Sequence, residues 1–401
     1  MSTILILATV LATSLLIKEI CRRLRIPIIV GQISAGIVLG LPLIRSFLFD
    51  PKSFSLIDLL SQLGILSLLF LAGLEIDFKK ILENARDAIL IALSSAFFPF
   101  IFGFLFVYFF FGGYFSSQGF DPLTLSLVFG IALAVTSEGT KVKVLMDLNA
   151  LDTRLGAIMV GAGAFDDLIE ILGLSFVTAL AQTGSTEELV MLPLNLLVFA
   201  FLFFLLAKVI SRLLKYVERK ETDVDLFLLV LILMMGLAAL SELFSLGSVI
   251  GAFVGGILMQ LSMRKVKKKE EEDILDSFKL LSLAFLAPFF FANVGLNFNL
   301  QSLFVNPSLL VGTIFIAFIG KIVGTMAIKP LSRLGWKQLY VIGWAMNSRG
   351  AVELVIALMA LGNGLLPLEV FSVLVVTSLV TTLTFPFVLE KEIRKDPKLL
   401  G

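Results

Sequence analysis

Two adjacent aspartates, Asp166 and Asp167, lie in the middle of a long apolar stretch of the sequence. Counted from residue 153 at about 1.5 Å per helical residue, Asp167 lies roughly 21 Å into that stretch. Adjacent helical residues point about 100° apart, so one carboxylate can face a cavity while the other pairs with a neighbouring helix. Carboxylate oxygens are hard ligands that suit Na⁺, Li⁺ and other hard cations. We therefore expect these residues to bind a cation or a proton.

One lysine, Lys321, lies equally deep in a second apolar stretch, residues 306–331. A lysine in hydrocarbon must find a carboxylate or lose its proton, because a lone charge there is poorly solvated. The other interpretation, that its amine reaches the membrane interface, requires a position nearer to an end of the stretch. We expect Asp166 or Asp167 to be its partner.

Two further apolar stretches are interrupted by polar residues and glycine, at residues 134–140 and 346–353. The first contains Thr136, Ser137 and Glu138, and the second contains Ser348, Arg349 and Glu353. Unwound segments expose helix ends that need compensating charge, which Glu138 and Arg349 could supply. Arg349 and Glu353 are also spaced i,i+4 and could simply pair with each other. The alternative interpretation of Glu138 is that it lies at the inner rim of the membrane.

The elements that must hold these residues are membrane helices. Of the 401 residues, 58% are hydrophobic and 16% are charged, whereas soluble domains are about a quarter charged. The apolar runs are long and continuous, unlike the alternating strands of a membrane barrel. This composition excludes a soluble enzyme, a nucleic-acid-binding protein and a disordered chain. We expect membrane lipid around the protein and no nucleic-acid partner.

Proton chemistry in this chain must use groups other than histidine. The sequence has no histidine, a single cysteine, Cys21, and a formal net charge of +1. Histidine is the usual side chain that titrates near neutral pH. A single cysteine forms neither an intramolecular disulfide nor a cysteine metal cluster. We expect carboxylates and lysine to handle protons, without a cofactor.

Thirteen stretches approach the length of about 20 apolar residues that a membrane helix needs. They are 3–17, 27–44, 55–75, 86–111, 121–146, 153–182, 191–216, 224–242, 246–263, 274–297, 306–331, 337–362 and 365–389. Basic residues gather in the loops after the odd-numbered stretches, Lys141 and Lys143 being counted among them. The positive-inside rule then places the N-terminus outside and the C-terminus inside.

Thirteen spans with an outward N-terminus divide into six, a connecting span and six. The two sets of six then enter the membrane from opposite sides, which is the inverted-repeat plan of secondary transporters. The interrupted stretches are the fifth of each set, and paired discontinuous helices are typical of a transporter's ion site. We expect an all-α polytopic membrane protein with two inverted six-helix repeats and crossed discontinuous helices.

These motifs resemble the cation/proton antiporter superfamily, in particular its electrogenic NapA-like branch. The resemblance covers nearly the whole chain and rests on Asp166-Asp167, Gly320-Lys321, residues 134–139, residues 348–353 and the phrase at 70–75. It implies the NhaA-like antiporter fold. It also implies that Asp167 binds the ion while Asp166 pairs with Lys321, and that Thr136 offers a backbone oxygen. The predicted ion site comprises Asp166, Asp167, Lys321, Thr136 and Ser137, with Na⁺ held by the two aspartates.

The resemblance further implies a homodimer of two-domain subunits in the inner or plasma membrane of the cell. The predicted parts are a dimerisation domain at 1–82 and 218–300, a core ion-transport domain at 84–184 and 305–390, a linker helix at 190–217 and a cytoplasmic tail at 391–401. Glu138 departs from the pattern, because an uncharged residue is expected after Thr136-Ser137. This departure bears on ion selectivity and stoichiometry.

Competition between Na⁺ (or Li⁺) and a proton for Asp167 would give antiport by alternating access. If Lys321 releases its proton when Na⁺ draws Asp166 away, two protons exchange for each Na⁺. A K⁺/H⁺ antiporter and a Na⁺-coupled symporter of organic solutes remain open. An intramembrane aspartyl protease would need carboxylates that face each other, and an open cation channel conflicts with a lysine beside the aspartates.

Overall fold

The computed structural model describes residues 3–24, 26–75, 85–151, 153–183, 198, 206, 212, 223–244, 246–263 and 268–400. These residues form helices joined by short turns, without a β-strand among them. Helices are the expected form for continuous apolar runs, because a backbone in hydrocarbon must satisfy its own hydrogen bonds. The predicted linker helix at 190–217 lies almost entirely outside the described residues.

Seven helical runs in the described chain are long and apolar enough to cross a membrane. They are α1 (Thr3–Arg23), α4 (Pro51–Glu75), the run of α6 (Ala85–Phe106), η1 (Val107–Phe111) and α7 (Gly112–Ser116), α12 (Asp223–Leu243), the run of α14 (Lys268–Lys279), η2 (Leu280–Leu286) and α15 (Ala287–Asn297), α16 (Pro307–Ala327) and α19 (Leu368–Lys395). An eighth is obtained if α2 (Ile28–Gly40) and α3 (Pro42–Leu48), bent by 75°, count as one span. The chain is an all-helical polytopic membrane protein.

The remaining described elements are shorter or carry charge. They are α8 (Pro122–Ala134), α9 (Glu138–Asp147), α10 (Arg154–Thr183), α13 (Ser248–Met263), α17 (Trp336–Ala345), α18 (Ala351–Gly362) and the 3₁₀ turns η3 (Gln301–Phe304) and η4 (Pro397–Leu400). Each predicted apolar stretch that lies within the described residues contains a helix. That thirteen of them cross the membrane stays a prediction.

The first helix is longer than its apolar stretch at 3–17, because its polar end is also helical. Glu19 forms ion pairs with Arg22 at 2.8 Å and with Arg23 at 3.1 Å, one turn along the same helix. Arginines in the last turn also face the negative end of the helix dipole. Charges that the sequence places in a loop therefore lie on the last turns of α1.

The described residues divide into two compact units. The first unit comprises residues 1–17, 34–76 and 178–296. Its core is formed where α4 and α12 pack against α13. Phe70 of α4 and Phe278 of α14 are fully buried there, with ring centroids 4.9 Å apart.

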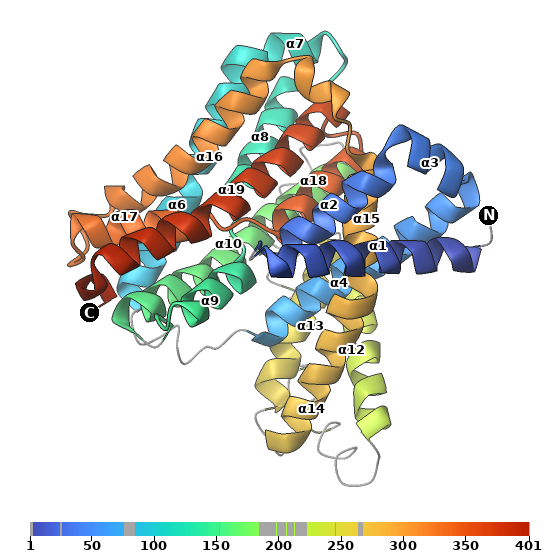
Figure 1. Ribbon diagram of the computed structural model, residues 1–401, viewed down its shortest axis with the longest axis horizontal. Helices are drawn as coiled ribbons and strands as arrows, with labels where there is room; N and C mark the ends of the chain where they lie inside the picture. Colours follow the sequence, from blue (N-terminus) through green and yellow to red (C-terminus); the bar gives the residue numbers. More distant parts are fainter. Residues whose placement is uncertain are drawn as a thin grey trace. The chain divides into compact units, whose positions relative to one another are not determined.

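The second unit comprises residues 18–33, 77–177 and 297–401, and it holds all the predicted site residues. Figure 1 shows α16 running beside α6 and α19 in this unit. The shorter helices α8 and α18 pack against these long ones. The roles assigned to the two domains, dimerisation and transport, stay predictions.

Candidate functional site

The helix predicted at 121–146 is interrupted where the sequence is polar. α8 ends at Ala134 and α9 begins at Glu138, and the backbone between them is extended, with φ −66° and ψ 146° at Val135. We call residues 135–137 the first break. A helix end leaves its last carbonyls without helical partners, so the end of α8 needs other donors.

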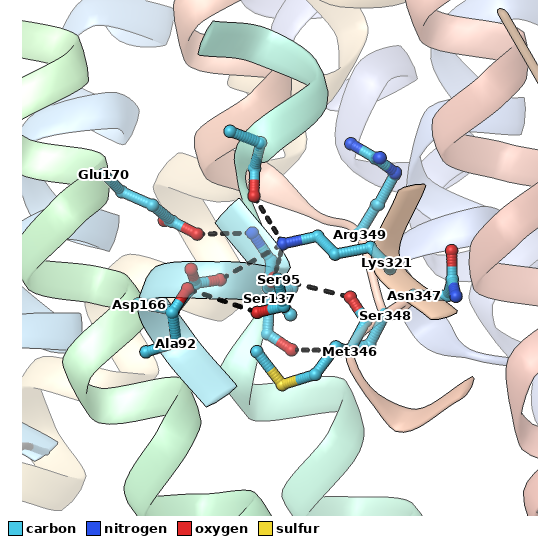
Figure 2. A network of polar contacts seen from close by, with 12 residues as sticks. Ala92, Ser95, Ser137, Asp166, Glu170, Lys321, Met346, Asn347, Ser348 and Arg349 are labelled. Carbon is cyan, nitrogen blue, oxygen red and sulfur yellow. Dashed lines mark hydrogen bonds and ion pairs between the residues drawn. The ribbon is translucent and has the colours of Figure 1, made fainter. Parts of the chain in front are cut away.

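The stretch at 337–362 is interrupted in the same way. α17 ends at Ala345 and α18 begins at Ala351, and we call residues 346–350 the second break. The two breaks are joined by reciprocal hydrogen bonds, from Ser137 N to Ser348 O and from Ser348 Oγ to Ser137 O, each 2.7 Å long. Figure 2 shows the two serines side by side. The discontinuous helices therefore meet at their interruptions.

Gly350 makes this close approach possible. A Cβ atom at this position would lie 2.4 Å from Ser137 Oγ and 2.6 Å from Ser137 Cβ. Its backbone is extended, so the requirement comes from space and not from an unusual φ. Only glycine leaves room for the first break at this point.

Arg349 supplies donors to the end of α8. Its guanidinium donates to Leu133 O at 2.8 Å and to Ala132 O at 3.4 Å. It also pairs with Glu353 at 3.2 Å, and both charged side chains are fully buried. A cation at a helix C-terminus is stabilised by the helix dipole. The two alternatives for Arg349, compensation of a helix end and pairing with Glu353, are therefore both present.

Lys321 reaches the same helix end from α16. Its amine donates to Thr136 Oγ1 at 2.5 Å and to Ala134 O, and it lies 3.4 Å from Asp166 Oδ2. Figure 2 shows the amine pointing toward Asp166 and the first break. The side chains of Lys321 and Asp166 are almost fully buried. The three acceptors match the three N–H groups of a charged ammonium.

The two aspartates of α10 differ in their surroundings. Asp166 is fully buried, and its Oδ1 has no hydrogen-bond partner among the described residues. Asp167, the next residue on the helix, is half-buried. This difference follows from the turn of about 100° between neighbouring helical residues. The structure thus brings Asp166, Lys321, Thr136 and Ser137 together, with Asp167 adjacent along α10.

Glu170 joins this group although it was not among the predicted ion ligands. It lies one turn after Asp166 on α10 and is buried, and it accepts a hydrogen bond from Thr136 N. The signal in the sequence is its i,i+4 spacing from Asp166, which places both on one face of the helix. The side chain of Glu138, which begins α9, lies outside the described residues.

The prediction that Lys141 belongs to a basic loop is wrong. Its side chain is fully buried, with the amine 3.7 Å from Met346 Sδ in the second break. The break lets the chain continue as α9 inside the second unit, so Lys141 lies within a helix. Lys143, two residues later, is exposed. A contact that carries no sequence signal is the Thr382 hydroxyl, which donates to Arg349 O at 2.8 Å.

A family model described as "Sodium/hydrogen exchanger, transmembrane" matches residues 7–391. The chain belongs to this family. The resemblance to the cation/proton antiporter superfamily is thereby confirmed. The chain is 32% identical over 395 residues to a Na⁺/H⁺ antiporter of Enterococcus hirae, covering 96% of each chain.

Other relatives of the chain also match over most of their length. It is 27% identical over 383 residues to the Na⁺/H⁺-K⁺ antiporter GerN of Bacillus cereus, covering 95% of this chain and 93% of that one. The solved structure of the sodium proton antiporter MjNhaP1 from Methanocaldococcus jannaschii matches with a TM-score of 0.72 and 17% identity, covering 100% and 99% of the two chains. The chain therefore has the fold of that solved structure.

Proposed function

We propose that this chain exchanges Na⁺ or Li⁺ for H⁺ across the membrane, with Asp167 as the principal ion ligand. The observation that carries the proposal is the buried amine of Lys321, shared between Asp166 and the first break. Family membership supports cation/proton exchange as the type of transport. The Enterococcus hirae relative is itself named a Na⁺/H⁺ antiporter.

Antiport follows from competition at one carboxylate. Asp167 is half-buried, so water and ions can reach it when the site opens to one side of the membrane. An ionised carboxylate attracts Na⁺, and a protonated one does not. The protein therefore changes between its inward-open and outward-open forms with either Na⁺ or a proton on Asp167. Alternating access of this site to the two sides completes the cycle.

Lys321 provides a second proton. When Na⁺ draws Asp166 toward Asp167, the lysine loses its charged partner and keeps two acceptors, Thr136 Oγ1 and Ala134 O. A neutral amine has two N–H groups, which those two acceptors satisfy. An unpaired ammonium in an apolar interior is costly. Loss of one proton from Lys321 therefore accompanies binding of Na⁺.

The charges of the two loaded states then set the stoichiometry. With Asp167 protonated and Asp166 paired with charged Lys321, these three side chains are neutral overall. With Na⁺ between two ionised aspartates and Lys321 neutral, the charge is −1. Two protons therefore move for each Na⁺, and each cycle carries one net charge across the membrane.

The whole-molecule arrangement we propose is thirteen spans, N-terminus out and C-terminus in, with inverted repeats. The support is the alternation of basic and nearly neutral loops in the sequence. The second unit would form the transport core in the plasma membrane, and the first unit would join two copies in a homodimer. No cofactor takes part, because the transported ions are the only reactants.

The test is ion-driven proton movement in proteoliposomes that contain the purified protein and a pH-sensitive dye. The wild type should respond to Na⁺ and Li⁺, and Asp167→Asn should abolish the response. Asp147→Asn, which changes an exposed aspartate at the end of α9, is the matched control. Near-normal exchange by Asp167→Asn would overturn the site assignment. An imposed voltage that leaves the wild-type rate unchanged would overturn the two-proton scheme.

K⁺/H⁺ exchange is the second candidate function. The observation that favours it is the name of the GerN relative, which is a Na⁺/H⁺-K⁺ antiporter. The same vesicles with K⁺ as the only driving cation distinguish the candidates. A response to K⁺ comparable to that to Na⁺ would establish the broader specificity.

A further inference from the structure

Glu170 is a buried acid beside the site to which the proposed exchange cycle gives no task. Its side chain is 5% exposed, and one carboxylate oxygen accepts the hydrogen bond from Thr136 N. Figure 2 shows Glu170 reaching from α10 to a backbone nitrogen of the first break. The other oxygen, Oε2, has no hydrogen-bond partner among the described residues.

The hydrogen bond satisfies a donor that the break creates. In a continuous helix, Thr136 N would donate to Ala132 O, four residues earlier. That carbonyl instead accepts from Arg349. Thr136 is 1% exposed, so water does not replace the missing partner. The same residue presents its hydroxyl oxygen to Lys321, so the position of its backbone determines where the lysine finds an acceptor.

Two connections hold the first break against α10. One is direct, from Thr136 to Glu170, and the other passes through Lys321 to Asp166. In the exchange proposed above, the second connection opens each time Na⁺ binds. The first involves neither the transported ion nor the lysine, so it can persist through the cycle.

We propose that Glu170 is a positioning residue that fixes the first break against α10 through the Thr136 amide. It acts on the ion site through Thr136 and Lys321. The proposal rests on the proposed exchange function. It requires an acceptor oxygen at the length of a glutamate side chain, and it does not require the negative charge.

Two substitutions of Glu170 separate the effect of its side-chain length from the effect of its charge. Glu170→Gln keeps the acceptor oxygen and its reach but removes the charge, whereas Glu170→Asp keeps the charge and shortens the side chain. We expect Glu170→Gln to retain the wild-type KM for Na⁺ and the wild-type pH profile. We expect Glu170→Asp to raise KM about tenfold with a smaller change in the maximal rate, because a lost hydrogen bond of about 1.4 kcal/mol is a factor of ten.

Amide hydrogen exchange of the segment 132–140 provides the structural measurement. The segment should exchange faster in Glu170→Asp and at the wild-type rate in Glu170→Gln. Glu369→Asp is the matched control, because Glu369 is also buried and accepts from Tyr114 and Asn306, away from both breaks. This control should change neither KM nor the exchange of 132–140.

The inference is overturned if Glu170→Gln is impaired, with or without impairment of Glu170→Asp, because the charge would then be needed. It is equally overturned if both variants match the wild type in KM and in amide exchange. A wild-type protein without cation-driven proton movement would overturn the proposed function instead. Amide exchange on the same purified protein would still test whether Glu170 holds the break.

Discussion

Lys321 illustrates how a single charged residue can be kept inside a membrane protein. Its amine lies closer to two neutral oxygens, Ala134 O at the end of α8 and Thr136 Oγ1 in the first break, than to Asp166, which is 3.4 Å away. The lysine is therefore held by neutral oxygens as well as by a carboxylate. This arrangement lets the ion pair change while the side chain stays in place.

The ion pair should nevertheless contribute to stability. Removing one partner of a buried pair leaves the other uncompensated and costs about 3–5 kcal/mol. Lys321→Gln removes the charge and keeps two N–H donors, on a side chain whose nitrogen is one bond closer to the backbone than the lysine amine. We expect Lys321→Gln and Asp166→Asn each to lower the thermal stability of the purified protein. The double variant should be more stable than the sum of the two losses predicts, and strict additivity would contradict the pair.

Gly350 offers a test of the contact between the two breaks. Gly350→Ala should destabilise the protein by about 1–3 kcal/mol, since overpacking a buried contact has this cost. Adding Ser137→Gly removes the two atoms closest to the new methyl group and leaves Ile29 Cδ1 at 3.5 Å, an ordinary contact distance, so it should restore part of the loss. Gly362→Ala is the control, because a Cβ there meets no atom within 4 Å. Thermal unfolding of the four proteins in one detergent is the measurement.

The sequence shows which charged residues lie deep in the membrane more reliably than it shows which groups they contact. The pair of Lys321 with Asp166 could be expected, because a buried amine needs a carboxylate. The bonds of Lys321 and Arg349 to carbonyls of α8 could not, because every residue offers the same carbonyl and spacing does not select one. Lys141 was assigned to a loop for a related reason, because in the sequence a charged residue near a helix break cannot be distinguished from one in a loop.

At the scale of elements, the end of α8 receives hydrogen bonds from two charged side chains. Arg349 bonds to Ala132 and Leu133, and Lys321 bonds to Ala134. These are three of the four carbonyls that a helix end leaves without partners. One cation from α16 and one from the second break thus stabilise the end of one half-helix. Interrupting a helix at this depth is tolerable only with such partners.

Arg349→Lys should lower stability although it keeps the charge. A lysine ammonium is a point charge on a flexible stem and lacks the planar fork that reaches two carbonyls and Glu353 together. We expect a loss of about 1.5–3 kcal/mol, the range for one hydrogen bond to a charged group. The matched control is Arg394→Lys on α19, whose exposed pair with Glu390 should be insensitive within about 0.5 kcal/mol. Equal melting temperatures for the two variants would contradict this role of Arg349.

Both interruptions could be located from the sequence, because hydroxyl groups, charge and glycine disturb a pattern that is otherwise apolar. The ends of elements were harder to predict. The stretch at 86–111 continues as helix to Ser116 through the π-helical turn Val107–Phe111, which apolar composition does not reveal. α16 ends at Ala327, before the predicted boundary at 331, and Pro330 prevents the helix from continuing.

For the whole molecule, an odd or even number of spans between two residues decides whether they lie on opposite sides or on the same side of the membrane. Between residue 117 and residue 398 the prediction places nine spans, from 121–146 to 365–389. An odd number puts these two positions on opposite sides of the membrane. Both are exposed in the structure, Ser117 after α7 and Lys398 near the C-terminus. They are therefore suitable sites for labelling from one side.

The protein provides a convenient parent for this experiment, because Cys21 is its only cysteine. In a Cys21→Ser background, Ser117→Cys should react with a membrane-impermeant maleimide in intact cells. Lys398→Cys should react only after the cells are lysed, since the positive-inside rule places the C-terminal basic residues inside. The opposite pattern would reverse the orientation. Labelling of both sites in intact cells would mean that an even number of spans separates them. The predicted thirteen spans would then be wrong, and the two six-helix sets would not enter the membrane from opposite sides.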